Sequence, residues 1–288
     1  MHLHCMKLFF LLVLLAPKVT FTAYSSSGYR DSSICFFPHS RIFASVFLDP
    51  LECQVSGSST FLFRKGIDRS LYNIVNFGFT KPLLAKHSEN QSWEINFGAA
   101  TFTQFNLLKK SNGDYLAGLL NNDYKLSADF SLQKKNSVFR IRLFHVSSHL
   151  GDDYMLRHND TIPNDKSNNY EQVDLTYLHK KENNYWYAGM GEIYTIYSFR
   201  KRFSVFCGGL WTYGNSDKIN FFGTFNLKLL QENNFSPDFR DAYGVNVMRN
   251  HESIMRIWIE FYSGRLPYST LKYGRISWMG AGMSFNLY

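Results

Sequence analysis

The sequence has few cysteines and no long apolar run after its first residues. Four of its 288 residues are cysteine, and Cys35, Cys53 and Cys207 are spaced too widely for a disulfide framework. One bridge, such as Cys35 to Cys53, would fit an oxidising compartment. No CxxC pair or zinc-ligand spacing occurs. Beyond Ala16 no stretch approaches the roughly 18 apolar residues of a membrane-spanning helix.

The sequence also lacks a concentrated basic stripe. Its formal net charge is +8, from 31 Lys and Arg and 23 Asp and Glu. Loss of Lys7 and Lys18 with an N-terminal signal would leave 29 minus 23, or +6. A mild and scattered excess of this kind argues against a nucleic-acid partner. It suits a surface that faces anionic lipid.

The N-terminus has the pattern of a secretory signal peptide. A basic start at Lys7 is followed by an apolar run from Leu8 to Ala16 and by small residues up to Ala23. The apolar run is too short to span a bilayer as a helix, although a buried helix or an anchor is an alternative. We therefore expect a cleaved signal at residues 1–23, an N-terminal extension at 24–48 and the main domain at 49–288.

Most of the chain alternates between apolar and polar residues, and no segment has a convincing helical period. The alternation is clearest at 93–107, 123–133, 218–229 and 253–261. Weaker strands are expected near 52–64, 70–80, 114–120, 185–196, 203–213, 240–249 and 275–288. Turn-forming residues separate several of them, at 111–114, 121–123, 180–184 and 215–217.

Strands of about ten residues with one apolar and one charged face predict an all-β fold, an antiparallel transmembrane β-barrel of about 10–12 strands. A closed barrel satisfies its backbone hydrogen bonds within lipid. A soluble β-sandwich would have the same alternation, with its apolar faces turned inward. The strand lengths, the aromatic content of 17% and the predicted export favour a barrel in the bacterial outer membrane.

The hairpin from Ser137 to Lys180 sets the register of the domain. If Arg142 lies opposite Asp174, as opposite charges prefer, then His145 lies opposite Glu171. His145, Ser147 and His149 continue the apolar stripe of the first arm, whereas Ser148 has the opposite parity. A His, a Ser and a Glu would then share one lipid-facing surface, next to the connection 150–168.

Polar groups on a lipid-facing wall are costly unless they pair. We expect Ser147 to pair with His145 and His145 with Glu171, which gives a nucleophile, a base and an orienting acid. Asn159, in the following loop, is a second candidate for the orienting residue. The alternative is that the apolar band ends at Leu143 and these residues are merely interfacial.

The loop after this strand is acidic. Asp152 and Asp153, with loop carbonyls, could bind calcium, which prefers oxygen ligands. The spacing matches no EF-hand loop, and a solvated acidic loop is the alternative interpretation.

Three stretches resemble a known family: Asp49 to Gln54, Arg142 to Tyr154, and Gly264 to Tyr268 with the Gly-rich last strand. Together they resemble the bacterial envelope proteins catalogued as domain of unknown function 1207, which implies a fold and a location but no activity. The His145-x-Ser147 motif is similar to that of outer-membrane phospholipase A and of the lipid A deacylase.

The second resemblance implies His145 as base, Ser147 as nucleophile and Glu171 or Asn159 as orienting residue. It also implies outer-membrane lipids as partners, calcium as a cofactor and a homodimer. The sequence departs from those enzymes at Ser148 and His149, where they tend to have Asn. The predicted activity is hydrolysis of acyl esters of outer-leaflet lipids.

A structural or transport barrel is the alternative function. In that case the polar side chains of the lumen would carry the function, as a narrow pore or a packed plug. These side chains are Arg140, Arg142, Asp174, Lys218, Lys228, Arg256 and Glu260.

Overall fold

A computed structural model of the chain describes residues 34–39, 41–63, 70–88, 91–109, 115–158, 169–195, 202–214, 216, 218–249, 252–267 and 274–286. All of them belong to one compact unit, Ser32–Tyr288. The signal peptide expected at residues 1–23 and the first part of the expected extension lie outside the described residues.

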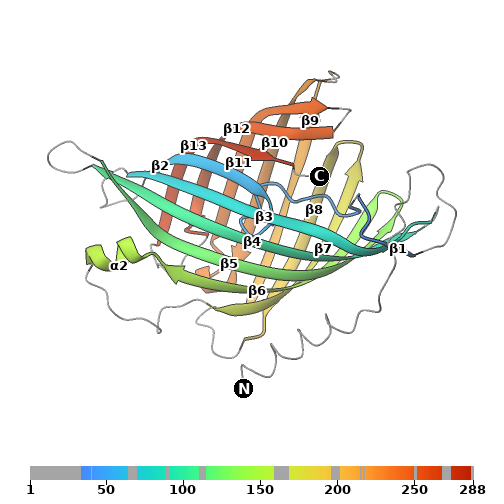
Figure 1. Ribbon diagram of the computed structural model, residues 1–288, viewed down its shortest axis with the longest axis horizontal. Coiled ribbons are helices and arrows are strands. Elements are labelled where there is room, and N and C mark those ends of the chain that lie inside the picture. The colour runs from blue at the N-terminus through green and yellow to red at the C-terminus, as the bar shows by residue number, and fades with distance from the viewer. Residues whose placement is uncertain are drawn as a thin grey trace. The chain divides into compact units, whose positions relative to one another are not determined.

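Twelve of the described strands close into an antiparallel barrel (Figure 1). Each strand pairs with its neighbours in sequence, and pairing of β2 with β13 closes the ring. The strands are β2 Val55–Phe63, β3 Ser70–Lys86, β4 Ser92–Lys109, β5 Tyr115–Lys134, β6 Ser137–Leu150, β7 Tyr170–Lys181, β8 Asn184–Ile193, β9 Phe203–Tyr213, β10 Ile219–Leu230, β11 Pro237–Arg249, β12 Glu252–Arg265 and β13 Arg275–Phe285. A short additional strand, β1 Ile34–Phe36, pairs with the end of β3.

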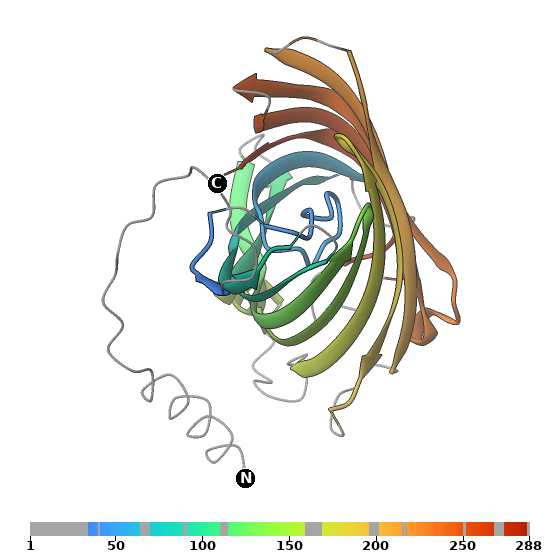
Figure 2. The ribbon, with the colours of Figure 1, turned by 90° about the vertical axis from the view of Figure 1, so that its right-hand side faces the viewer.

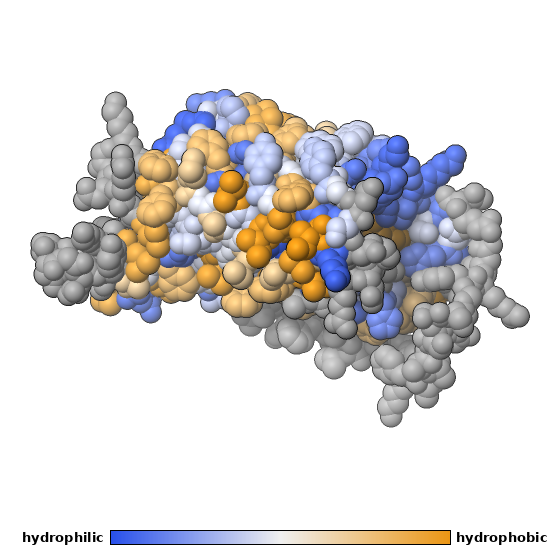
Figure 3. Space-filling model, turned by 90° about the horizontal axis from the view of Figure 1, so that it is seen from above, coloured by the Kyte–Doolittle hydropathy of each residue, from blue (hydrophilic) through white to orange (hydrophobic). Residues whose placement is uncertain are grey.

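The barrel has its polar side chains inside and its apolar side chains outside. In β5 the outward Tyr124 and Leu126 are 51% and 52% exposed, whereas Asp123 and Lys125 are 3% and 1% exposed. Apolar side chains make up much of the face shown in Figure 3. A soluble sandwich would have the reverse distribution, so the transmembrane β-barrel is the confirmed fold class.

The two ends of the barrel differ in their connections. One end, the short-turn end, has two-residue turns at 135–136 and 182–183, and β11 and β12 are also joined there by two residues. The other, the long-loop end, carries the longest connection, 151–169, together with 194–202 and 266–274. Outer-membrane barrels have short turns on the periplasmic side and longer loops on the extracellular side. Helix α2, Asp152–His158, begins the longest connection.

Two local predictions were wrong. The turn expected at 121–123 and the separate strands on either side of it are one 20-residue strand, β5. A bulge accommodates the polar residues, because the register with β4 shifts between Gln104 and Phe105. Asn121 then donates a side-chain hydrogen bond to Asp123 within the barrel, at 2.5 Å. The predicted lack of helix also missed α2, which is too short to show a period.

Residues 41–53, here called the inner segment, pass through the inside of the barrel (Figure 2). Near the short-turn end, the Ile42 amide donates to Glu94 at 2.8 Å. Midway, the Phe47 ring packs edge-on against Trp258, with centroids 5.0 Å apart. Part of the stretch expected to be an N-terminal extension therefore fills the lumen.

Buried ion pairs fix the inner segment to the wall. Glu52 contacts Arg140 at 3.4 Å and Arg142 at 2.9 Å, and Arg142 also pairs with Asp174 at 2.7 Å and with Asp49 at 3.5 Å. Burial alone would raise the pKa of Glu52, but the neighbouring charges of Arg140 and Arg142 more than offset it and lower that pKa. The lumen along the inner segment therefore contains paired buried charges of both signs.

The three cysteines in the described part of the chain are free, so the structure does not contain the bridge from Cys35 to Cys53 that an oxidising compartment would allow. Cys35 is exposed next to β3, whereas Cys53 is buried in the lumen. Among the described residues, no helix is long and apolar enough to cross a membrane.

Candidate functional site

The predicted register of the β6–β7 hairpin is confirmed. Arg142 lies opposite Asp174, and His145 lies opposite Glu171. His145 Nδ1 and Glu171 Oε1 are 2.8 Å apart, a hydrogen bond across the two strands. Their side chains are 43% and 33% exposed. Since His145 shares its face with the exposed Ile141 and Leu143, this pair lies on the outer wall.

Glu171 is held by a second partner. Its Oε2 accepts a hydrogen bond from the Thr195 hydroxyl, and its backbone amide donates to the same hydroxyl oxygen at 2.6 Å. Thr195 follows the end of β8, the strand next to β7. The carboxylate therefore has one oxygen fixed by Thr195 and the other directed at His145.

Ser147 makes a different contact from the one expected. Its Oγ lies 2.8 Å from His149 Nε2, and the structure has no hydrogen bond from Ser147 to His145 among the described residues. The His149 ring packs at 65° against Tyr124, with centroids 5.9 Å apart. The outer wall thus holds two pairs side by side, His145 with Glu171 and Ser147 with His149. Ser148 points inward and is buried, as its parity predicts.

This surface lies at the long-loop end of the barrel. Glu171 is the second residue of β7, directly after the connection 151–169, and His149 is the last but one residue of β6. A histidine whose Nδ1 is held by a carboxylate presents its other nitrogen as an acceptor. The arrangement can therefore activate a hydroxyl group at the edge of the apolar wall.

The two candidate calcium ligands lie at the start of the connection that follows β6. Asp152 and Asp153 lie in the first turn of α2, where the Asp153 carboxylate accepts the Leu119 amide at 2.8 Å. No three His, Cys, Asp or Glu side chains come together for a metal ion within the described parts of the chain. Asn159 and the rest of the connection up to residue 168 lie outside the described residues, so the calcium site stays a prediction.

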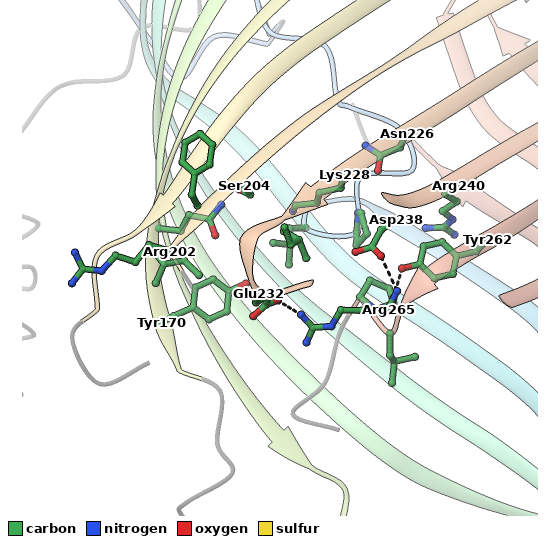
Figure 4. A pocket seen from close by; sticks show the side chains of 18 residues that line it. Tyr170, Arg202, Ser204, Asn226, Lys228, Glu232, Asp238, Arg240, Tyr262 and Arg265 are labelled. Carbon is green, nitrogen blue, oxygen red and sulfur yellow. Dashed lines mark hydrogen bonds and ion pairs between the residues drawn. The ribbon is translucent and has the colours of Figure 1, made fainter. Parts of the chain in front are cut away.

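A cavity of ≈ 40 Å³ lies on the inner side of the same wall (Figure 4). Tyr170 and Gln172, the neighbours of Glu171, line it from β7. Arg265 also lines the cavity; its side chain pairs with Glu232 at 2.5 Å, and its backbone amide donates to Asp238 at 2.9 Å. Since Glu171 faces outward, this cavity is separate from the outer-wall pairs.

The sequence analysis did not identify Thr195 as a partner of Glu171. Thr195 lies beyond the end of a strand, where the alternation of apolar and polar residues does not indicate which way a side chain points. His149 was also missed as the partner of Ser147, although the His-x-Ser-x-His spacing placed all three on one face.

Solved structures share the fold. Outer membrane phospholipase A from Escherichia coli is similar with a TM-score of 0.53 and 9% identity, over 86% of this chain and 94% of that one. An active-site mutant of the same enzyme is similar with a TM-score of 0.52 and 8% identity, over 81% of this chain and 90% of that one. The Salmonella typhi outer membrane phospholipase, a dimer with bound calcium, is similar with a TM-score of 0.51 and 10% identity, over 81% of this chain and 90% of that one. At these identities the likeness shows the fold alone.

Two comparisons concern sequence. A family model described as protein of unknown function (DUF1207) matches residues 32–287. No curated protein matches the chain.

Proposed function

The chain belongs to the DUF1207 family, and we propose that it is an outer-membrane serine hydrolase that cleaves acyl esters of outer-leaflet lipids, either phospholipid or lipid A. The observation that carries the proposal is the 2.8 Å bond between His145 and Glu171 on the outer wall. A carboxylate–histidine pair facing lipid has no structural need there, because apolar side chains would suit the wall better.

The position of His145 and Ser147 on the barrel also supports a lipid substrate. The long-loop end of an outer-membrane barrel faces outside, so His145 and Ser147 would lie at the level of the outer leaflet. A lipid would reach them sideways, with its acyl chains along the apolar wall and its ester at the polar boundary. We propose that the segment at residues 1–23 exports the protein to this membrane.

In the proposed reaction Ser147 is the nucleophile and His145 is the general base. His145 is the better base of the two histidines because Glu171 orients its ring and would stabilise the imidazolium that forms. The Ser147 hydroxyl must turn about its Cα–Cβ bond from His149 toward His145. Its proton passes to His145 as the oxygen attacks the ester carbonyl, and His145 then protonates the departing alcohol. Water, activated by the same histidine, releases the fatty acid from Ser147.

Release of fatty acid is the direct test. The detergent-refolded full-length protein is incubated with phospholipid and, separately, with lipid A, with and without calcium. We expect release from at least one lipid, and its loss by about 10³-fold or more in His145→Ala. Equal release by wild type and His145→Ala, with folding intact, would contradict the assignment of the base. The calcium arm reports whether the 159–168 loop supplies ligands that the described residues lack.

A structural barrel is the second candidate, and the packed lumen favours it. Residues 41–53 fill the interior, and the arginines expected to line a pore, Arg140 and Arg142, are paired with the inner segment. An open transport pore is therefore the weaker form of this alternative. Absence of hydrolysis of both lipids by a folded barrel would leave the structural role.

A further inference from the structure

A row of polar side chains crosses the outer wall from β4 to β6. The hydroxyls of Thr101 and Thr103 on β4 both donate to Asn122 Oδ1 on β5, each at 2.8 Å. Asn122 lies directly opposite His149 on β6, two pairs along from Ser147, which lies opposite Tyr124. Alternate residues share a face, so Asn122 projects outward like Tyr124.

The two threonines fix how the Asn122 amide points. Thr101 and Thr103 lie on the β4 side of β5, and both engage the amide oxygen. The amide oxygen is thereby committed to β4, and the amide nitrogen is left for a partner other than these threonines. Within the described part of the chain, no hydrogen bond from this Nδ2 is present, and the side chain is only half-buried. Two N–H donors are thus available at the outer surface.

A hydrolase on a barrel wall can use such a side chain. Acyl transfer requires hydrogen-bond donors at the position where the oxyanion develops. Backbone N–H groups commonly fill that role, but those of β5 and β6 are engaged in the barrel ladder. A side chain next to the nucleophile, on the side away from the base, can supply the donor instead. His145 lies on one side of Ser147, and the row of Asn122 and His149 lies on the other.

We propose that Asn122 is a catalytic residue whose side-chain amide donates a hydrogen bond to the oxyanion, with Thr101 and Thr103 as its positioning residues. This rests on the proposed function. When Ser147 Oγ bonds to the ester carbon and its proton passes to His145, the carbonyl π electrons move onto the oxygen. Asn122 Nδ2 binds that oxygen until the C–O bond to the alcohol breaks and the carbonyl re-forms.

Asn122→Asp keeps an oxygen for both threonine hydroxyls and removes the N–H donors, and it also adds a negative charge. We expect kcat for lipid hydrolysis to fall by about 10²–10³-fold with KM little changed. Asn122→Ala, which adds no charge, should lose a similar factor. Thr103→Val, which loosens the amide without removing it, should lose less. Folding is checked for each variant by circular dichroism and by heat-modifiable electrophoretic mobility.

Ser147→Ala distinguishes a failure of the proposed role of Asn122 from a failure of the proposed hydrolase function. If wild type is active, Ser147→Ala is inactive and both Asn122 variants keep the wild-type kcat, the role of Asn122 is overturned and the proposed function stands. A loss confined to Asn122→Asp would also overturn it, since it would reflect the added charge. If folded wild type hydrolyses neither lipid, the proposed function fails and the role of Asn122 fails with it.

Discussion

Glu52 joins the inner segment to two arginines of the wall, and Glu52→Gln tests how much this pairing stabilises the barrel. Glu52 is 1% exposed and contacts both Arg140 and Arg142. Arg142 would keep Asp174 at 2.7 Å, but Glu52 is the carboxylate that Arg140 contacts. Among the described residues, the substitution therefore leaves the buried Arg140 charge without an ion-pair partner.

Loss of one partner of a buried ion pair costs about 3–5 kcal/mol. We expect Glu52→Gln to lower the free energy of unfolding by about that amount or somewhat less. The loss is reduced because the Arg140 guanidinium keeps its cation–π contact with the Phe43 ring, 3.8 Å from the ring centroid. The assay is denaturant unfolding of the full chain in lipid vesicles, followed by tryptophan fluorescence. Glu52→Gln combined with Arg140→Met should recover much of the loss. A single variant as stable as wild type would refute the account of the lumen.

The same ion pairs predict a pH dependence. The pKa values of Asp49 and Glu52 are lowered in the folded protein because the attraction of nearby cations outweighs the effect of burial. A lowered pKa stabilises the fold fully above the ordinary values of 3.8 and 4.5, and this contribution is lost as the pH falls below them. Wild type should therefore lose more stability than Glu52→Gln between pH 7 and pH 3. Parallel losses in the two proteins would contradict this assignment.

Two further predictions concern the outer wall. Thr195→Val removes the hydroxyl that holds Glu171, so kcat should fall by about tenfold, and Thr195→Ser should restore the wild-type kcat. An unchanged kcat in Thr195→Val would show that Glu171 is held in place without the Thr195 hydroxyl. His149→Ala removes the residue that Ser147 contacts in this structure but leaves His145, so the rate of hydrolysis should stay within about tenfold of wild type. A loss of rate as large as that in His145→Ala would indicate that His149 is the base instead.

The fold was predictable because alternation is a local property. One polar and one apolar face recur in nearly every strand, and the opposite charges of Arg142 and Asp174 were enough to set the register of β6 and β7. The same register brought His145 and Glu171 together. Alternation does not say which face is inside, and that distinction came from strand length, aromatic content and predicted export.

The remaining features depend on contacts between distant residues. Nothing in the local pattern of residues 41–53 indicates that Phe47 packs against Trp258 inside the barrel, more than 200 positions away. The residues at 121–123 have the composition of a turn, yet cross-strand hydrogen bonds from Thr101 and Thr103 hold Asn122 within β5. Treating that segment as a turn concealed the donor next to Ser147.

Covalent labelling of Ser147 would test the central claim most directly. The folded full-length protein is treated with a serine-reactive fluorophosphonate in detergent and in vesicles, and the labelled peptide is identified by mass spectrometry. The account predicts a single label on Ser147 that is absent in Ser147→Ala and strongly slowed in His145→Ala. Labelling of another residue in an active protein, or release of fatty acid that Ser147→Ala retains, would contradict it.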